Sequence, residues 1–306
     1  MISKLRKMFI VAEIGINHNG NFLLAKELIK KAKYAGADAV KFQTYITNNL
    51  YNKKYTEKKV IRYMRKFELK NYEYFKLKKF CKKLNIEFFS SPFDVNSAVF
   101  LNSLKIKKFK IASSNIRNKK LIEKIKSFKK EIILSSGYAD LKSLKKISRN
   151  FKKNKLSILY CVSHYPAPMD IINLNEIHNI KKVIKKVKVG YSDHTKGIGI
   201  AIASKFYGAE ILEKHLKLHK NHKCPDKNVS ISPDQFKEMV STIRAIENFK
   251  TSFSQKKKRG EIGIYYNKNL KKGQKLKLEY LDFKRPSIKF SHDKLSKIIG
   301  KKLNTN

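Results

Sequence analysis

Short apolar runs alternate with segments of helical periodicity along the first 250 residues of the chain. The runs have the length of β-strands, and the segments between them place apolar residues on one face of a helix. In residues 21–36, for example, Leu24, Leu28 and Ala32 fall on one stripe, with lysines elsewhere. The last helical segment, 232–249, opens with Ser-Pro-Asp, a typical helix start. The strand-like runs are 8–15, 38–45, 86–93, 109–115, 131–137, 156–166, 188–195 and 209–216.

Eight such strand–helix units predict an α/β fold with a parallel sheet, and their number favours closure into a (β/α)8 TIM barrel over residues 1–250. A doubly wound open sheet is the structural alternative. After residue 250 the chain changes character. A lysine-rich linker, 251–259, leads into 260–306, where β-prone stretches alternate with turn residues. We therefore expect a barrel domain, a linker and a small second domain.

Each strand-like run begins apolar and ends in polar side chains. In a barrel the carboxyl ends of the strands share one rim, where active sites of this fold lie. Turn chemistry accounts for any single serine or aspartate there, but not readily for eight polar ends together. We therefore expect an active site at that rim. The polar ends are Glu13, Lys41 with Gln43, Ser90 with Ser91, Lys110 with Ser113, Ser135 with Ser136, Ser163 with Tyr165, Asp193 with His194, and Glu213 with His215.

The rim residues indicate two kinds of ligand. Lys41 and Lys110, surrounded by serine hydroxyls, suit a phosphate group, whose oxygens accept many hydrogen bonds. The chain has no Gly-x-x-x-x-Gly-Lys loop, so a nucleoside triphosphate is not indicated. His194 and His215 end neighbouring strands, so they could share one divalent metal and leave positions open for substrate and water. The alternative is that both are polar side chains satisfied within the fold.

A rival metal cluster lies in the loop after the last strand. "HLKLHKNHKC" offers His215, His219, His222 and Cys224 within a short span, which suggests zinc. Its spacing matches no closed structural zinc site, and the loop is rich in lysine. We therefore expect the metal, if there is one, at the rim.

The formal charge of +46 invites a nucleic-acid interpretation, but the kind of basic residue argues against it. The chain has 62 Lys and only 8 Arg, spread over its whole length, whereas base and phosphate recognition favours Arg. No apolar run approaches the roughly 18 residues needed to span a membrane, and Glu13 interrupts the first run too early for a signal peptide. Three widely spaced cysteines do not suggest disulfides. We expect a cytoplasmic protein without specific nucleic-acid or membrane partners.

Several motifs together resemble one enzyme family, the sialic acid synthases, which include N-acetylneuraminate and legionaminate synthases. The resemblance covers residues 9 to about 250, in the family's order. It implies a (β/α)8 barrel that condenses phosphoenolpyruvate with an N-acetylated mannosamine-type sugar, giving a nine-carbon 2-keto acid and phosphate. The motifs are "AEIGINHNG" (12–20), "AGADAVKFQTY" (35–45), "FSSPFD" (89–94), "FKIASS" (109–114), "ILSSGY" (133–138), "CVSHYPAP" (161–168), "GYSDHT" (190–195) and "EKHL" (213–216).

The resemblance also implies roles for individual residues. His194 and His215 correspond to ligands of Mn2+ or Mg2+, and Glu13 to an active-site carboxylate that handles a water proton. Asp226 corresponds to an acid that positions the sugar. The residues implied to bind phosphoenolpyruvate are Lys41, Ser91, Lys110, Ser113, Ser135, Ser163 and Ser192, and those implied to bind the sugar are Tyr165 and Glu213.

Residues 260–306 resemble the family's small C-terminal antifreeze-like (SAF) domain, through "KKGQ" and "KRP". In the family this domain comes from the partner of a domain-swapped homodimer and places an arginine over the sugar, which implies that role for Arg285. The tail ends soon afterwards, so we expect a shortened domain. Ser163 stands where N-acetylneuraminate-specific members carry Asn, which leaves the sugar open.

Three functions remain in competition. The first is the synthase, with N-acetylmannosamine or, as the nearest alternative, 2,4-diacetamido-2,4,6-trideoxymannose, the precursor of N,N'-diacetyllegionaminate. The second is an aldolase that forms a Schiff base at Lys110 or Lys41. The third is a basic binding protein with a degenerate site.

Overall fold

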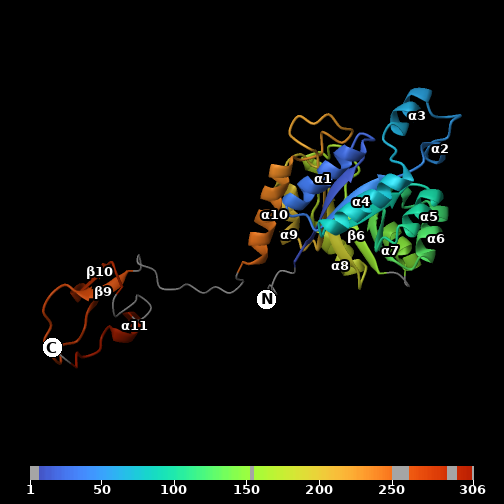
Figure 1. Cartoon of the computed structure of the whole chain (residues 1–306). Coiled ribbons are helices and arrows are strands. Elements are labelled where there is room, and N and C mark those ends of the chain that lie inside the picture. Colours follow the sequence, from blue (N-terminus) through green and yellow to red (C-terminus); the bar gives the residue numbers. More distant parts are fainter. Residues whose placement is uncertain (1–6, 152–154, 250–261, 288–294, 305–306) are drawn as a thin grey trace. The chain divides into compact units, whose positions relative to one another are not determined.

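The computed structural model describes residues 7–151, 155–249, 262–287 and 295–304 (Figure 1). It divides into two compact units, Met1–Phe249 and Lys250–Asn306. The predicted linker, 251–259, lies outside the described residues.

The first unit is a closed barrel of eight parallel strands in the order β1 to β8, which confirms the predicted (β/α)8 fold and excludes the open sheet. Strand β1 closes the barrel by pairing with both β2 and β8. The strands are β1 Phe9–Gly15, β2 Ala39–Thr44, β3 Glu87–Pro92, β4 Lys108–Ile111, β5 Glu131–Ser135, β6 Leu156–Cys161, β7 Lys188–Asp193 and β8 Ile211–His215.

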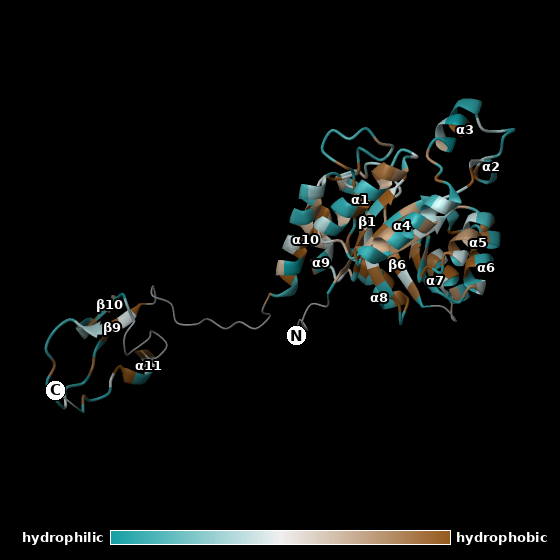
Figure 2. Ribbon diagram, viewed as in Figure 1, coloured by the Kyte–Doolittle hydropathy of each residue, from teal (hydrophilic) through white to brown (hydrophobic). Residues whose placement is uncertain are grey.

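Helices surround the barrel and turn their apolar faces towards it (Figure 2). Helix α10 begins as its sequence predicts: the Ser232 side chain caps it, Gln235 completes a capping box, and Pro233 is its first residue. The helices of this unit are α1 Phe22–Tyr34, α2 Thr47–Leu50, α3 Lys58–Arg65, α4 Asn71–Lys83, α5 Val95–Ser103, α6 Lys119–Ser127, α7 Leu141–Ser148, α8 Asn175–Val183, α9 Gly199–Phe206 and α10 Pro233–Glu247, with short 3-10 turns at Ser113–Asn115, Arg149–Phe151 and Met169–Ile171.

The barrel interior is filled in layers, because alternate residues of each strand face inward. A middle layer of apolar side chains forms its own buried cluster, separate from the core between strands and helices. Two residues further along, the same strands carry polar side chains: on β1, for example, Val11 is followed by Glu13, and on β8 Ile211 is followed by Glu213. The middle layer consists of Val11, Ala39, Phe89, Ile133, Leu159 and Ile211.

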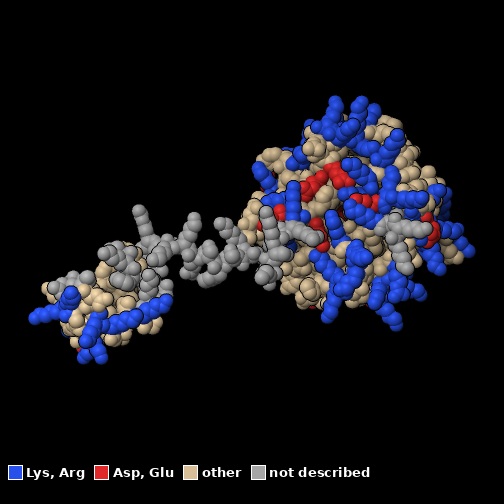
Figure 3. Space-filling model, turned by 90° about the horizontal axis from the view of Figure 1, so that it is seen from below, with Lys and Arg blue, Asp and Glu red and all other residues tan. Residues whose placement is uncertain are grey.

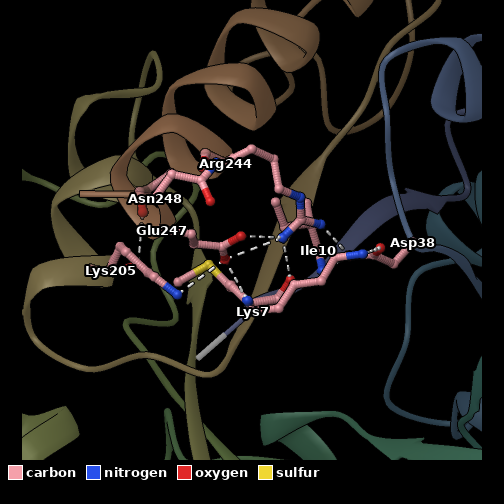
Figure 4. Close-up of polar contacts among 10 residues, drawn as sticks. Lys7, Ile10, Asp38, Lys205, Arg244, Glu247 and Asn248 are labelled. Atoms are coloured by element: carbon pink, nitrogen blue, oxygen red, sulfur yellow. Dashed lines mark hydrogen bonds and ion pairs between the residues drawn. The ribbon is translucent and has the colours of Figure 1, made fainter. Parts of the chain in front are cut away.

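The opposite end of the barrel, where the strands begin, is held by ion pairs. Figure 4 shows Arg244 of α10 between two carboxylates, 2.7 Å from Asp38 and 3.1 Å from Glu247, while Lys205 lies 3.0 Å from Glu247. Seen from below, this face has acidic side chains near its middle and lysine and arginine around them (Figure 3). These contacts tie α9 and α10 to the start of the barrel, an end at which a TIM barrel is stabilised rather than catalytic.

The second unit is small. Strands β9 Gly263–Tyr266 and β10 Leu281–Lys284 form an antiparallel pair, followed by the short helix α11 Leu295–Ile298. A 3-10 turn, Leu278–Tyr280, precedes β10, and Leu276 and Leu281 are buried.

Within the described ranges, no helix is both long enough and apolar enough to cross a membrane. Cys81, Cys161 and Cys224 are all free and buried.

Gly190 offers a test of the barrel register. A Cβ at this position would lie 2.1 Å from the Ile211 carbonyl oxygen of neighbouring β8, a backbone atom that cannot move aside. We expect Gly190→Ala to lower the free energy of unfolding by about 1–3 kcal/mol or more. Gly199, the first residue of α9, has nothing within 4 Å of the same position, so Gly199→Ala is the matched control and should be neutral or stabilising. Urea unfolding measures both, and equal stability of the two variants would contradict this register.

Candidate active site

A cavity of about 310 Å³ opens at the carboxyl ends of the barrel strands. Every residue to which the family resemblance gives a role, except Arg285, lines this cavity, so the structure brings together side chains spread over more than 200 positions. The cavity is lined by Glu13, Lys41, Gln43, Ser91, Phe93, Lys110, Ala112, Ser113, Ser114, Ser135, Tyr138, Cys161, Ser163, Tyr165, Ser192, His194, Glu213, His215 and Asp226.

Strand register places the polar side chains at one level. Glu13 pairs with Lys41 on β2 and with His215 on β8, and Ser192 of β7 pairs with Glu213. Glu13, Lys41 and Glu213 lie two positions beyond the apolar layer on their strands, so their side chains face inward and meet above it. Ser90 and Asp193 do not line the cavity. Each is next to an inward-facing residue, Ser91 or Ser192, so its own side chain points to the other face of the strand.

Two ammonium groups and two carboxylates form a buried ionic network at the floor. Lys41 Nζ lies 2.8 Å from Glu13 Oε2 and 3.7 Å from Glu213 Oε1. Lys110 Nζ lies 3.6 Å from the same Glu213 oxygen. Glu213 is therefore shared by both lysines, and it links charges contributed by β2, β4 and β8.

Serine hydroxyls surround the network and supply further hydrogen-bonding groups. Lys41 Nζ donates to Ser91 Oγ at 3.2 Å and Lys110 Nζ to Ser135 Oγ at 2.7 Å, while Ser192 Oγ donates to Glu213 Oε1 at 2.9 Å. Ser113 and Ser163 are joined by a hydrogen bond of 3.0 Å between their hydroxyls. Two cations framed by hydroxyls form a fitting receptor for a phosphate or carboxylate group.

The two carboxyl groups have opposite acid–base character. Burial raises the pKa of Glu13, and the nearby Lys41 ammonium only partly offsets this. Burial also acts to raise the pKa of Glu213, but Lys110 and Lys41 overcome it and hold that pKa at about 2. Glu213 is therefore the permanent anion, while Glu13 is the better placed of the two to accept and release a proton.

The pKa values of the two lysines are also shifted in opposite directions. Burial acts to lower the pKa of Lys41, but the carboxylates of Glu13 and Glu213 raise it above its usual value. For Lys110 burial prevails over Glu213, so its pKa is lowered. An anionic ligand beside Lys110 would supply the negative charge that this ammonium lacks.

The His194 imidazole is fixed in one tautomer. Its Nδ1 lies 2.7 Å from the Val162 carbonyl oxygen, which can only accept, so Nδ1 carries the proton. Burial and the neighbouring His215 lower the pKa of His194 to about 4, which keeps the ring neutral near pH 7. The Nε2 lone pair then faces the Tyr165 hydroxyl at 3.0 Å. Metal-ligating histidines are held in this manner, with one nitrogen bonded to a carbonyl and the other available.

His215 completes a donor set that fits a divalent cation. Its ring centre lies 5.6 Å from that of His194, and its Nδ1 lies 3.2 Å from Asp226 Oδ2. Both atoms are buried, and apart from this ion pair neither makes a hydrogen bond within the described residues. Among the residues that the structure describes, no three His, Cys, Asp or Glu side chains are grouped to enclose a metal. An ion held by His194 and His215 would therefore keep positions for water and substrate.

Two histidines of the rival zinc cluster, His219 and His222, lie in different environments. His219 is exposed, and the ring centres of His219 and His222 lie 5.8 Å apart. His222 Nδ1 accepts a hydrogen bond from the Leu218 backbone, which gives it a structural role in the loop.

Arg285 lies in the second unit, where it is exposed and directly precedes Pro286. Its predicted role over the sugar stays a prediction.

Three further lining residues have no role in the sequence-based prediction. Gln43 Nε2 donates to Glu13 Oε1 at 3.4 Å, Cys161 pairs in register with Ser192, and the exposed ring of Tyr138 lies at the opening. Gln43 is already among the polar strand ends named from the sequence. Cys161 follows Leu159 by two residues, so alternation turns it inward once Leu159 is known to face inward. Tyr138 lies in a loop and carries no such signal.

Known proteins resemble this chain along most of its length. The model of the NeuB family matches residues 28–255. The N,N'-diacetyllegionaminic acid synthase of Campylobacter jejuni is 36% identical over 321 residues, covering 97% of this chain and 96% of that protein. The N-acetylneuraminate-9-phosphate synthase of Homo sapiens is 31% identical over 256 residues, covering 78% of this chain and 70% of that protein. The crystal structure of the sialic acid synthetase of Leptospira borgpetersenii has a TM-score of 0.76 at 32% identity, covering 82% of this chain and 88% of that chain.

The shared carboxylate gives a pH-dependent prediction for stability. The folded-state pKa of Glu213 lies near 2, below its ordinary 4.5, so its contribution is present above about pH 4.5 and is lost as pH falls towards 2. We expect wild type to exceed Glu213→Gln in unfolding free energy by about 3 kcal/mol at pH 5, and this advantage to shrink by about 2 kcal/mol at pH 3. Urea unfolding with chelator present measures it. A difference independent of pH would contradict the ionic role of Glu213.

Proposed function

Because the chain belongs to the NeuB family, we propose that it condenses phosphoenolpyruvate with an N-acetylated amino sugar, giving a nine-carbon 2-keto acid and inorganic phosphate. It is a carbon–carbon bond-forming transferase, like the synthases that it resembles. The observation that carries the proposal is the pair of buried ammonium groups, Lys41 and Lys110, framed by serine hydroxyls at the carboxyl end of the barrel.

Phosphoenolpyruvate carries a phosphate and a carboxylate, and the site offers a separate cation for each. Lys110 is bonded to Ser135 and Lys41 to Ser91, and each ammonium lies within 4 Å of Glu213 Oε1. The Ser91 and Ser135 hydroxyls accept from the lysines and keep their own protons to donate to the anionic oxygens, as does one of Ser113 and Ser163. Ser192 would have to release Glu213 to join them. Such charge-assisted contacts fix both ends of the substrate and hold its enol carbon in one place.

The reaction then needs one new carbon–carbon bond and one broken carbon–oxygen bond. The enol carbon attacks the aldehyde carbon of the open-chain sugar, and the aldehyde oxygen becomes a hydroxyl on taking a proton. Positive charge develops at the carbon that bears the phosphate, water adds there, and Glu13 accepts its proton. The bond between this carbon and the bridging oxygen then breaks while the new hydroxyl gives its proton to the leaving phosphate, which releases inorganic phosphate and leaves the 2-keto group.

His194 and His215 would hold Mn2+ or Mg2+, and Asp226 would bind beside them or orient the sugar. When bound, such an ion acts as a Lewis acid towards an aldehyde oxygen. The Tyr165 hydroxyl, 3.0 Å from His194 Nε2, lies where the sugar would meet this pair, and the Glu213 carboxylate lies within the same cavity.

The sugar has two candidates, N-acetylmannosamine and 2,4-diacetamido-2,4,6-trideoxymannose. The second is favoured by the Campylobacter relative, whose similarity covers 97% of this chain. The small side chain of Ser163 in the cavity wall is compatible with it, since it leaves more room than Asn.

A Schiff-base aldolase is the competing chemistry for the same cavity. Both candidate lysines are paired with carboxylates, and the Lys41 pKa is raised, which disfavours the neutral amine that attacks a carbonyl. Lys110 is the remaining candidate, and borohydride trapping with pyruvate tests it. Labelling of Lys110 together with absence of phosphate release would favour the aldolase. Tight binding of anions without turnover of any substrate would favour a binding protein.

We also propose that the second unit acts as an SAF-type domain in a swapped homodimer, with Arg285 of one protomer over the sugar of the other. A guanidinium suits the carbonyl of an acetamido group, and Arg285 is exposed and free to reach a ligand. The activity is assigned to the cytoplasm, where phosphoenolpyruvate is formed.

The function predicts metal-dependent phosphate release. Phosphoenolpyruvate with Mn2+ and one of the two sugars should yield phosphate, and chelator should stop it. His194→Ala should reduce the rate by at least about 100-fold, because the ion loses one of its two protein ligands. His178→Ala is the matched control, since His178 is exposed on α8, and it should retain full activity. Phosphate release that neither chelator nor His194→Ala affects would contradict the metal assignment.

The swapped dimer predicts complementation between two defective variants. Arg285→Ala should raise the KM for the sugar about tenfold or more and leave that for phosphoenolpyruvate unchanged, whereas neighbouring Lys284→Ala should change neither. Refolding Arg285→Ala together with His194→Ala should restore wild-type KM at some sites, because one barrel then receives an intact arginine from its partner. Steady-state kinetics of the mixture measure this, and a mixture no better than its components would exclude the swap.

A further inference from the structure

A fully buried ion pair lies on the outer side of the barrel wall, directly behind the two histidines. Lys214 Nζ of β8 lies 2.8 Å from Asp193 Oδ2 of β7, and both side chains are completely inaccessible to solvent. Neither residue lines the cavity. Alternation along the strands explains this, because Asp193 lies between inward-facing Ser192 and His194, and Lys214 between Glu213 and His215.

The pair also holds the backbone beyond β7. Asp193 Oδ1 accepts hydrogen bonds from the backbone N–H and the hydroxyl of Thr195, both at 2.8 Å. Lys214 Nζ donates to the Thr195 carbonyl oxygen at 2.6 Å. Asp193, Thr195 and Lys214 are called the strand clamp below. His194 lies between two members of the clamp and His215 directly follows the third, so the clamp fixes the chain at both histidines.

Stability alone does not account for this arrangement. A buried ion pair can often be replaced by apolar side chains of similar size with no loss of stability, because both charges must be stripped of water. The preceding outward-facing residues of the same strands, Tyr191 and Leu212, belong to the hydrophobic core between strands and helices. An apolar pair at the next position would simply extend that core.

We propose that the strand clamp sets the separation and orientation of His194 and His215 as a ligand pair for a divalent cation. Asp193 and Lys214 are then positioning residues, since they touch neither substrate nor ion. Their charges fix Thr195 in three hydrogen bonds of defined direction, which apolar contacts cannot do. The inference rests on the proposed function only in taking these histidines as metal ligands.

The test compares Mn2+ affinity with stability in a variant that removes both charges at once. Asp193→Leu with Lys214→Met leaves no unpaired buried charge but removes three hydrogen bonds to Thr195, so we expect the variant to fold with a lowered melting temperature. We expect its Mn2+ affinity, measured by calorimetry without substrate, to fall about 10- to 100-fold, the usual effect of losing a group that orients metal ligands. The matched control is Lys205→Met with Glu247→Leu, which removes another buried pair at the opposite end of the barrel and should leave Mn2+ affinity unchanged.

Thr195→Val keeps the ion pair and removes only the hydrogen bond from the Thr195 hydroxyl to Asp193. It therefore tests the role of the strand clamp if the double variant does not fold. We expect a smaller loss of Mn2+ affinity in the same direction. Wild-type affinity in the folded double variant, or in Thr195→Val, would overturn the inference while leaving the proposed function intact. Absence of Mn2+ binding by wild type would overturn the metal assignment itself, and phosphate release would then judge the reaction separately.

Discussion

The shared carboxylate of Glu213 is the interaction on which the candidate site depends. Two ammonium groups buried in one cavity repel each other and are costly to remove from water. Glu213 lies within 4 Å of both, so the barrel can hold Lys41 and Lys110 charged at a fixed spacing. Without this anion, Glu13 would be the remaining carboxylate to offset the charge of the two ammonium groups. A site that binds an anionic substrate is therefore built around an anion of its own.

The barrel makes this network possible through its layered interior. The apolar layer that contains Val11 and Ile211 closes the barrel below, so water reaches the polar layer only from the carboxyl side. Ionic interactions are stronger in such a partly dry setting than in water. The same setting gives the two carboxyl groups different pKa values. Glu213 is held as an anion, and the pKa of Glu13 is raised, which favours proton exchange. Geometry and acid–base character thus have one origin, the position of each residue along its strand.

Much of the fold could be predicted from the sequence because β-strand and helix periods differ so clearly in this chain. The end of each apolar run marked a strand end, and in a closed barrel strand ends converge. What the runs did not reveal was parity, the choice of which of two neighbouring polar residues faces inward. Asp193 and His194 both end the seventh run, and the structure turns Asp193 outward to Lys214. Asp226 and Tyr138 lie in loops, whose course depends on tertiary contacts such as the hydrogen bond from the Asp226 backbone to Asn17.

We propose that Lys110 and Lys41, held by Glu213, bind phosphoenolpyruvate. The most direct test is calorimetric titration of chelator-treated protein with phosphoenolpyruvate, comparing wild type with Lys110→Met. Methionine keeps much of the side-chain volume and leaves Glu213 paired with Lys41, so the barrel should remain folded. Loss of one charge-assisted contact should weaken binding about tenfold or more. Equal affinity in a folded Lys110→Met variant would contradict the claim.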